Sequence, residues 1–460
     1  MATSIMKKSP ISPLMNKVAG YIAAAPRRAL PAKVQEKTKH HLLDTLAAIV
    51  SGSRLHPGQK AIEYVESQGG TPEALVLGSR IVTSVTNAAL ANGMCAHADE
   101  TDDSHAASLT HPGCGVVPAG LALGERNRRS GQELLRAVAL GYDLCARLSL
   151  SLGAYDFRDA GHSTHTFGPT FGAAAAAGAM AGFDKTQVRH LLSYTAQQVS
   201  GVACWMRDAE HVEKAFDFGG MPARNGVAAA SMVAAGFTAV DDVFDGERNF
   251  YVAYGGLGDP AILGKDLGRV YEIMNTNIKR WSVGSPIQAP LDSLLELIRT
   301  HSISANDVER VEVRVSITGA NTTDDRHMPD ISMQHMVACM LIDGIVTFES
   351  SHDEARMQDP KVQALRKKVT LIGDPALQKV MPSRQGIVTL TLRNGRRLRH
   401  HTKAVRGTAQ NPMTRAEVDE KCYHLLAPVL GKARARKLVD AVWALEKVKD
   451  VRTLRPLLRA

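Results

Sequence analysis

Apolar side chains recur at helical spacing through most of the first 270 residues. In residues 34–52 they share one helical face, and that segment ends at a glycine: Leu42, Leu43, Leu46, Ala47 and Val50. Residues 130–152 repeat the pattern behind a serine that can cap a helix. Residues 171–183 are so rich in Ala and Gly that we predict a central helix with close neighbours. Further helices are predicted over 185–201 and 225–236, and no segment before about residue 270 alternates like a strand.

After residue 270 the pattern changes. Residues 308–317 are β-branched and alternate imperfectly, which predicts a strand, and residues 386–402 predict a hairpin with Asn394-Gly395 as a type I′ turn. The helical segment 332–344 lies between these strands. Thr414 and Glu417 then have the spacing of a capping box ahead of another helix.

This order of elements predicts a mainly α protein with a smaller α+β domain. We expect a discontinuous all-helical domain over residues 1–270, an inserted α+β lid domain over 271–405, and C-terminal helices over 406–460 that return to the helical domain.

Composition favours a globular, cytoplasmic protein. No apolar run approaches the roughly 20 residues that span a bilayer, so we expect no membrane partner. The six cysteines form no CxxC pair and are expected to be reduced, buried thiols.

The net charge is +9, but aromatic residues do not interleave with the basic clusters, which argues against nucleic-acid binding and favours attraction of an anionic metabolite. The basic N-terminus, residues 1–17, is expected to be a short disordered lead-in, with a mitochondrial transit peptide as the alternative.

The segment 97–114, HADETDDSHAASLTHPGC, concentrates acids and histidines within a few turns of chain: Asp99, Glu100, Asp102, Asp103, His105 and His111. Like charges this close raise one another's pKa, and histidines titrate near neutrality, so the segment suits proton transfer. The alternative is a solvated acidic helix end, although its flanks on both sides are apolar.

Four further segments carry polar residues that helical packing does not require. Residues 160–172 are expected to form a Gly-flanked loop that presents His162 and His165 before a helix N-terminus, where a carboxylate can bind. A half-built metal site is the alternative, but no third ligand has zinc-like spacing.

The other three segments each have a plain structural alternative. Lys214 precedes a double glycine and Arg224, and as an isolated residue would be a solvated helix end. Lys279 and Arg280 precede a turn, where they would otherwise be surface charges of a linker. His335 lies on an apolar helix and would otherwise be a satisfied core residue.

Taken together these segments resemble the MmgE/PrpD family of 2-methylcitrate dehydratase-like proteins. The resemblance covers nearly the whole chain and rests on long motifs in order: LLDTLAAIVSGS, the acidic segment ending in HPG, GHSTHTFGPTFGAAAAAG, KAFDFGGMPARNG and VACMLIDG. It implies a cofactor-free, metal-independent homodimer that acts on a small carboxylic acid. It also implies a mainly helical domain with a smaller lid domain.

The resemblance implies catalytic roles for residues of the acidic segment, for one histidine of residues 160–172 and for two lysines: Asp99, Glu100, Asp103, Ser104, His111, His162, Lys214 and Lys279. Substrate-binding roles are expected for His105, Arg224, Arg280 and His335. Two positions depart from the family pattern, because Glu100 stands where Asp is usual and His335 replaces a tyrosine. A Cys or His that usually follows the Lys279 turn is also missing. These departures leave the substrate open.

The residues suit proton removal beside a carboxylate, since the aci-carboxylate that forms needs nearby cations such as Lys214, Lys279 and Arg224. His162 or His111 would take the proton, and the other histidine or a protonated acid would act as general acid. The predicted function is a hydro-lyase that dehydrates a hydroxylated di- or tricarboxylic acid. Epimerisation or decarboxylation, as in iminodisuccinate epimerase or cis-aconitate decarboxylase, is the alternative within the family. A non-catalytic organic-acid-binding protein is the alternative outside enzymes.

Overall fold

The computed structural model describes residues 10–460, and the chain folds into two compact units. The first unit comprises residues up to 98, residues 107–275 and residues 422–460, and the second comprises residues 99–106 and 276–421. The acidic segment thus leaves the first unit at residue 99 and returns to it at residue 107. The domain limits at residues 270 and 405 remain predictions.

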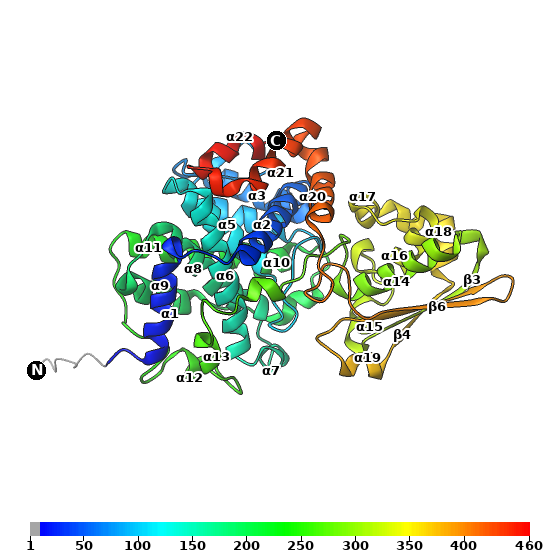
Figure 1. Ribbon diagram of the computed structural model, residues 1–460, viewed down its shortest axis with the longest axis horizontal. Helices are drawn as coiled ribbons and strands as arrows, with labels where there is room; N and C mark the ends of the chain where they lie inside the picture. The colour runs from blue at the N-terminus through cyan, green and yellow to red at the C-terminus, as the bar shows by residue number, and fades with distance from the viewer. Residues whose placement is uncertain (1–9) are drawn as a thin grey trace, which may run out of the picture. The chain divides into compact units, whose positions relative to one another are not determined.

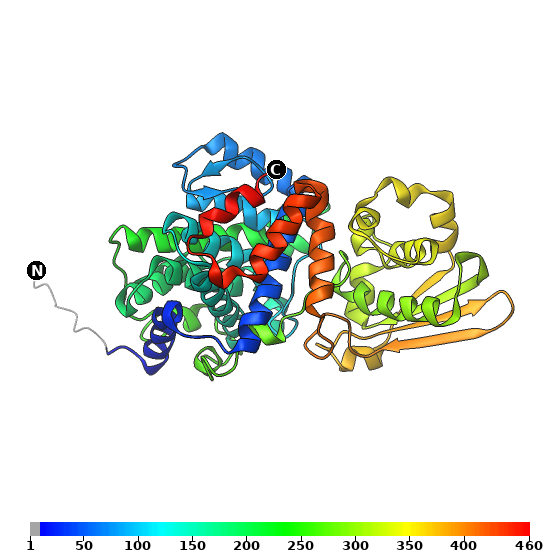
Figure 2. The same cartoon turned by 45° about the horizontal axis from the view of Figure 1, so that its top comes forward.

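The first unit is built from helices, as the periodicity predicts. Its longer helices are α1 (Pro13–Ala24), α2 (Ala32–Gly52), α3 (His56–Gln68), α4 (Val85–Ala96), α5 (Pro112–Arg126), α6 (Gly131–Ser151), α8 (Thr164–Ala181), α9 (Lys185–Gln198), α11 (Met221–Ala234) and α21 (Lys432–Trp443). The shorter ones are α7 (Ala154–Asp159), α10 (Val212–Ala215), α12 (Phe250–Tyr254), α13 (Ala261–Gly264) and α22 (Arg455–Leu458). Figure 2 shows the C-terminal helices, in red, beside the blue α2, which α21 contacts.

Helix α8 is the centre of this unit, and it packs against α5, α6 and α11 (Figure 1). Glycines let the backbones approach: a Cβ at Gly172 would meet the carbonyl oxygen of Gly141 in α6, and a Cβ at Gly226 of α11 would meet the backbone of Ala174. The predicted central Ala-rich helix with close neighbours is therefore confirmed.

Two local expectations for this unit were wrong. The helix begins at Thr164 and runs through Pro169, so residues 164–172 are helical and only the start of the predicted loop is irregular. Gly168 packs against the backbone of Cys145, and such burial outweighs the hydrogen bond that Pro169 cannot donate. The unit also contains two short antiparallel strands, β1 (Ala74–Leu75) and β2 (Val82–Thr83), which are too short to show alternation.

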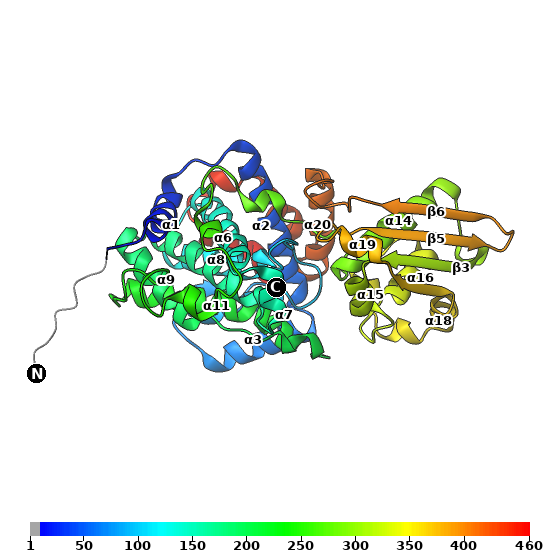
Figure 3. The ribbon, with the colours of Figure 1, turned by 90° about the horizontal axis from the view of Figure 1, so that it is seen from below.

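The second unit combines helices with a four-stranded mixed sheet. Its strands are β3 (Val308–Val315), β4 (Val369–Gly373), β5 (Gly386–Leu392) and β6 (Arg397–Thr402), in the order β4-β3-β5-β6. Strand β3 pairs in parallel with β4 and antiparallel with β5, and β5 pairs antiparallel with β6 (Figure 3). The predicted strands at 308 and 386–402 are confirmed.

The helices of the second unit are α14 (Ser285–His301), α15 (Ile317–Thr323), α16 (Met333–Asp343), α17 (Phe348–His352), α18 (Pro360–Arg366) and α19 (Pro375–Lys379). Of these, α14, α15, α16 and α18 share one apolar core with the sheet. The core joins the valines of β3 to Leu291 and Leu294 of α14 and to Met336 of α16. The alternating valines of β3 therefore cover the buried face, as expected for a sheet with one packed side.

The β5–β6 hairpin has a different turn from the predicted type I′. Gly395 has a positive φ of 81°, but Asn394 does not, and type I′ requires both. Gly395 N–H donates to Leu392 O, and Leu392 N–H donates to Arg396 O, which matches a type I turn followed by a glycine in the left-handed region.

Several local sequence signals are confirmed. Thr414 and Glu417 form the capping box of α20 (Arg415–Leu430), and Ser130 and Glu133 form that of α6. All six cysteines are free, five of them buried, but Cys204 is half-buried. Among the described residues no helix has both the length and the apolar character that crossing a bilayer requires. Most of the predicted N-terminal lead-in, residues 1–9, lies outside the described residues, and α1 already begins at Pro13.

The contact between Gly93 of α4 and Gly219 makes a testable prediction. A Cβ on either glycine would overlap the carbonyl group of the other. We expect Gly93→Ala to lower the free energy of unfolding by about 1–3 kcal/mol, the usual cost of overpacking. Gly20→Ala in α1 is the matched control, since its Cβ would meet only the Lys185 side chain at 3.6 Å. That control should raise stability by about 0.5–1 kcal/mol. Thermal and urea unfolding of both variants measures the difference, and equal stability would show that α4 can move aside.

Candidate functional site

Four histidines of the first unit gather around the ring of Phe218. They come from segments far apart in sequence: His97 follows α4, His111 caps α5, His165 lies in the first turn of α8, and His211 caps α10. Three of them are buried and His165 is half-buried. We call these four residues the histidine cluster.

Phe218 is stacked between two of these imidazoles. The ring centroid of His165 lies 3.8 Å and that of His97 4.2 Å from the centroid of Phe218, with interplanar angles of 7° and 18°. If both imidazoles lay on the same face of Phe218 at these distances, their atoms would overlap. His97 and His165 therefore occupy opposite faces of the phenyl ring. The phenyl ring thereby sets the separation of the two imidazoles.

His111 connects the two sides of this stack. Its ring centroid is 4.8 Å from that of His97, 5.3 Å from that of His165 and 5.3 Å from that of Phe218. His211 contacts His97 at 5.2 Å. The cluster therefore offers several proton carriers within one contiguous group of rings.

Two helix N-termini bring backbone N–H groups to the cluster. His111 precedes Pro112 at the start of α5, and His165 is the second residue of α8. Thr164 Oγ1 donates to the carbonyl of Leu109 at 2.7 Å, which ties the two helix starts together. Such N-termini favour anions because their N–H groups have no intrahelical partner and their dipoles are positive.

Phe218 is presented by an irregular turn of helix. Residues Phe216–Gly220 (η3) are π-helical between α10 and α11, and π-turns of this kind are frequent at functional sites. The backbone contact between Gly219 and Gly93 seats this turn on α4, and Cys114 Sγ lies 3.3 Å from the carbonyl of Phe218. The glycines of the KAFDFGG motif therefore determine where the Phe218 ring stands.

Lys214 places a positive charge beside the cluster. Its Nζ lies 5.4 Å from the ring centroid of Phe218 and 5.8 Å from that of Trp205, in the range of cation–π attraction. Its backbone N–H donates to Asp208 Oδ2 at 2.9 Å, which holds the start of α10. An ammonium and imidazoles side by side are the components of a carboxylate site that also moves protons.

The first unit brings together only some of the predicted residues. His111 and Lys214 belong to the group around Phe218. His162 lies apart from the histidine cluster, stacked on Phe157 at 4.3 Å between ring centroids. Arg224 places its guanidinium 5.3 Å from the ring centroid of Phe216 and donates to Asn225 Oδ1. Its role, like those of the other site residues, remains a prediction.

Three members of the histidine cluster were not among the predicted site residues. In the sequence, His165 stands beside His162 in a segment expected to be a loop, and a loop gives no reason to choose one histidine over the other. In the structure, α8 begins at Thr164, and the ring of His165 stacks on Phe218. His97 opens the acidic motif and His211 stands three residues before Lys214. His211 also adopts a left-handed backbone with φ of 61°, an uncommon conformation that the sequence does not signal.

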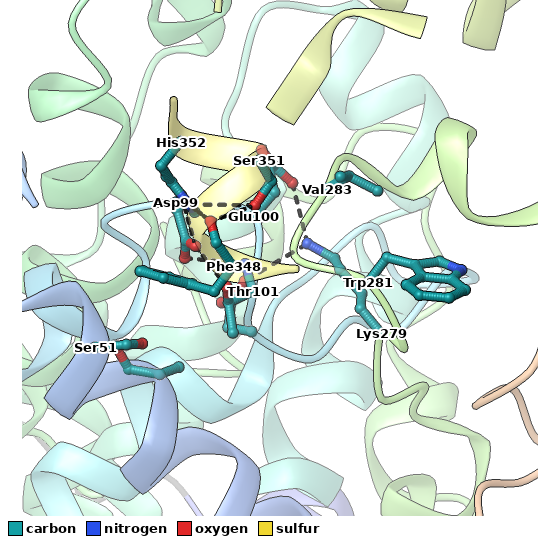
Figure 4. A network of polar contacts seen from close by, with 12 residues as sticks. Ser51, Asp99, Glu100, Thr101, Lys279, Trp281, Val283, Phe348, Ser351 and His352 are labelled. Atoms are coloured by element: carbon teal, nitrogen blue, oxygen red, sulfur yellow. Dashed lines mark hydrogen bonds and ion pairs between the residues drawn. The ribbon is translucent and has the colours of Figure 1, made fainter. Parts of the chain in front are cut away.

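In the second unit the acidic segment forms ion pairs of its own. Asp99 Oδ2 lies 3.0 Å from Nε2 of His352, the last residue of α17 (Figure 4). His352 Nδ1 lies 2.7 Å from the carbonyl of Phe348. Both ring nitrogens therefore face acceptors, which is the arrangement of an imidazolium. His352 was not predicted, because a histidine in a polar loop region carries no motif.

Each partner of this pair shifts the other's pKa. Burial disfavours the imidazolium, but the hydrogen bond and charge of Asp99 outweigh burial and raise the pKa of His352 to about 9. Burial likewise opposes ionisation of Asp99, yet His352 and the Thr101 hydroxyl hold the pKa of Asp99 below its usual value. The pair is therefore ionised at neutral pH.

Lys279 is held by other carboxylates of the same segment. Its Nζ lies 3.0 Å from Glu100 Oε2 (Figure 4). The same Nζ lies 3.7 Å from Asp102 Oδ1, and the Lys279 side chain is only 2% exposed. Burial lowers the pKa of Lys279, but Glu100 and Asp102 outweigh burial and raise it. The interpretation of Lys279 as a surface charge of a linker is therefore wrong.

The acidic segment is not a solvated helix end either. Asp102 and Asp103 are fully buried, and Asp99 and Glu100 are nearly so. His105 is also buried, and Ser104 exchanges backbone hydrogen bonds with Asn277 near Lys279. The apolar flanks were the sequence signal that pointed to burial.

The remaining predicted residues of the second unit lie on other elements. Arg280 Nη1 is 3.6 Å from Asp292 Oδ1, and its guanidinium lies 4.6 Å from the ring centroid of Trp281. His335 is fully buried in α16, with Nε2 3.5 Å from Cys339 Sγ. Burial and nearby Arg366 and Arg356 lower the pKa of His335 to about 4, so it is neutral at physiological pH.

Comparison with known proteins relates the whole chain to one family. The model of the MmgE/PrpD N-terminal domain matches residues 16–262, and that of the MmgE/PrpD C-terminal domain matches residues 281–447. A human cis-aconitate decarboxylase is 26% identical over 445 residues, which cover 93% of this chain and 90% of the relative. The cis-aconitate decarboxylase of Aspergillus terreus strain NIH 2624 is 22% identical over 461 residues, covering 93% and 92% of the two chains. The cis-aconitate decarboxylase-like protein oryM of Aspergillus oryzae is also 22% identical, covering 93% and 94%.

The Asp99–His352 pair predicts a definite pH dependence. Because folding raises the pKa of His352, its contribution to stability is complete below the unfolded value near 6.5 and is lost as pH rises through about 9. A rise of this size corresponds to roughly 3 kcal/mol. We expect His352→Gln to be less stable than wild type by up to that amount at pH 6, with the difference disappearing near pH 10.

Urea unfolding at pH 6, 8 and 10 measures this difference. His327→Gln is the matched control, because His327 is an exposed histidine of the same unit and its loss should not change the profile. A stability difference between wild type and His352→Gln that stays constant across this range would mean that the ion pair does not form.

Proposed function

Because the chain belongs to the MmgE/PrpD family, we propose that it is a lyase for a small di- or tricarboxylic acid. The observation that carries the proposal is the histidine cluster around Phe218 with Lys214 beside it. Imidazoles supply proton carriers, and the ammonium and two helix N-termini supply positive potential for carboxylates.

The names of the relatives favour decarboxylation as the reaction. Relatives that align over 93% of this chain are named cis-aconitate decarboxylases. The sequence motifs alone favour dehydration of a hydroxylated acid. With the relatives taken into account, we propose decarboxylation of an unsaturated tricarboxylic acid as the reaction, and dehydration of a hydroxylated acid as the alternative. Identities of 22–26% leave room for either substrate.

Both reactions pass through the same kind of intermediate. In decarboxylation the bond to one carboxylate carbon breaks and CO₂ leaves. The electron pair is delocalised, through the double bond of an unsaturated acid, into a second carboxylate, until one carbon of this delocalised system takes a proton. In dehydration a base removes the proton beside a carboxylate, and the hydroxyl leaves as water after it is protonated. Each route concentrates negative charge on one carboxylate, and a cation placed there beforehand lowers the barrier.

The cluster can supply these steps from its own side chains. His111 contacts the rings of His97 and His165, so one imidazole can give or take the substrate proton while a neighbour holds another. Lys214 would meet the carboxylate on which charge develops. His162 and Arg224 stay in the proposal as predicted residues of the same unit.

The second unit contributes predicted residues of another kind. Lys279, Glu100 and Asp102 form a buried charged group, and Asp99 with His352 forms a second pair beside it. We propose that this charged segment serves the same reaction, with Asp103, Ser104, His105, Arg280 and His335 as its further predicted residues. Assembly as a homodimer also remains a proposal drawn from the family.

A single assay separates the proposed reactions. The protein is incubated in D₂O with cis-aconitate, 2-methylcitrate, citrate, malate and iminodisuccinate, and each sample is followed by proton NMR. Decarboxylation yields a product with one carboxylate fewer and one deuterium at a carbon that shared the electron pair left behind by CO₂. Dehydration creates a new vinyl or allylic signal, and epimerisation exchanges the α-proton without changing the formula. Saturable binding with no change in any acid would instead support a binding protein and sink the lyase proposal.

Substitution of Lys214 tests the proposed role of its charge. We expect Lys214→Ala to lower kcat/KM by roughly a hundredfold or more, since one donor to developing charge is worth about 3 kcal/mol. Lys214→Arg should recover part of the loss, because the charge is retained with another geometry. Lys437→Ala, which removes an exposed lysine of α21, is the control and should behave as wild type. A loss below about threefold in Lys214→Ala would show that this ammonium has no part in the reaction.

A further inference from the structure

Trp205 lies against Phe218 and His165 of the candidate site and close to Lys214. It stands in a short 3-10 segment, η2 (Ala203–Arg207), and is half-buried. Its ring meets Phe218 edge-on, with centroids 4.6 Å apart and planes at 89°, and meets His165 at 5.3 Å and 85°. The Nζ of Lys214 lies 5.8 Å from the Trp205 centroid and 5.4 Å from that of Phe218. The ammonium is therefore within cation–π range of two aromatic rings set at right angles to each other.

A buried hydrogen-bond relay fixes the indole in this position. Trp205 Nε1–H donates to Ser163 Oγ at 3.1 Å, and the Ser163 hydroxyl donates to Asp217 Oδ2 at 2.5 Å. Ser163 is fully buried and Asp217 is 5% exposed. Asp217 precedes Phe218 on the π-helical turn, so the relay ties both aromatic rings to one piece of backbone.

Backbone hydrogen bonds also hold the segment that carries Trp205. Ser163 N–H donates to Gly201 O, and Ala203 N–H donates to Gly161 O, so the segment ahead of Trp205 pairs with the segment ahead of α8. Gly201 has a φ of 138° and fits closely against Thr166 and Ser163, which leaves no room for a side chain. The indole is thus held by its own N–H and by the chain that carries it.

We propose that Trp205 is a positioning residue that sets, together with Phe218, the place of the Lys214 ammonium. The inference rests on the proposed function in that Lys214 is the cation for the substrate. Indole is the aromatic ring that attracts a cation most strongly. Such attraction leaves the positive charge in place, so an ammonium held by rings can still meet a carboxylate. Ser163 and Asp217 act through Trp205, since their hydrogen bonds hold the indole.

The first experiment tests the placement without reference to turnover. Lysines of the intact protein are ¹³C-dimethylated, and the Lys214 methyl resonance is assigned from its absence in Lys214→Arg. Ring currents of Trp205 and Phe218 should displace this resonance from the main lysine envelope. We expect Trp205→Leu to return it toward the envelope and Ser163→Ala to broaden or shift it. Trp443→Phe, which alters a buried tryptophan of α21, is the matched control and should leave it unchanged.

The second experiment measures the consequence for the reaction, with cis-aconitate as the first acid tried. We expect Trp205→Leu to lower kcat/KM about tenfold, in keeping with a partly desolvated cation–π contact. Trp205→Phe should recover part of that loss because it keeps an aromatic face, and Ser163→Ala should fall between wild type and Trp205→Leu. Circular dichroism and melting temperature identify any variant that fails to fold. If Trp205→Leu does not fold, Trp205→Phe and Ser163→Ala are used to test the proposal.

The outcomes separate this inference from the proposed function. An unmoved Lys214 resonance in folded Trp205→Leu overturns the positioning role. A moved resonance with wild-type turnover in that variant also overturns it, because the position of the ammonium would then not matter. If wild type converts none of the acids while the resonance moves as expected, the proposed function fails and the placement of Lys214 by Trp205 is supported.

Discussion

The close approach of helix backbones in the first unit is the constraint on which its candidate site depends. Gly93 and Gly219 touch through their backbones, and so do glycines between α8 and its neighbours α6 and α11. At these points a methyl group would push the helices apart, and native interiors have few voids to absorb such a shift. His97 and His165 lie at the ends of α4 and α8, so the spacing of the helices also sets the spacing of these imidazoles.

Phe218 connects this helix packing to the arrangement of the candidate site. The π-helical turn that carries Phe218 packs on α4 through Gly219, and the Phe218 ring is stacked between His97 and His165. A phenyl ring carries no titratable group, yet here it determines where two titratable rings stand. The aromatic contacts also exclude water from one side of the imidazoles, which strengthens the electrostatic effect of nearby charges.

The two site lysines have different surroundings. In the second unit, Lys279 is buried between Glu100 and Asp102, where each carboxylate repays part of the cost of desolvating the ammonium. In the first unit, the Lys214 ammonium is within cation–π range of the rings of Phe218 and Trp205. The proposed chemistry is centred on Lys214 because its ammonium lies beside the ring around which the histidines gather.

By itself the sequence determined many of the helices with their caps, the strands β3, β5 and β6, and the inventory of chemical groups. Helical periodicity, the capping boxes at Ser130 and Thr414, and the β-branched run of β3 are local signals, because they depend on neighbours within a few residues. The motifs likewise identified the family and pointed to His111, Lys214 and the acidic segment. Apolar flanks were enough to suggest that this segment is buried.

Only the tertiary structure decided which of those groups meet. His97, His111, His165 and His211 are separated by up to 114 positions, the difference between 211 and 97, and no local pattern relates them. Burial also overrode local preference at Pro169, where packing of Gly168 keeps α8 helical through a residue typical of a loop. The hairpin turn at Gly395 and the pairing of Asp99 with His352 depend in the same way on partners brought from elsewhere. Ring stacking and ion pairing act through space over a few ångströms, so the sequence can supply the partners but only the folded chain brings them within range.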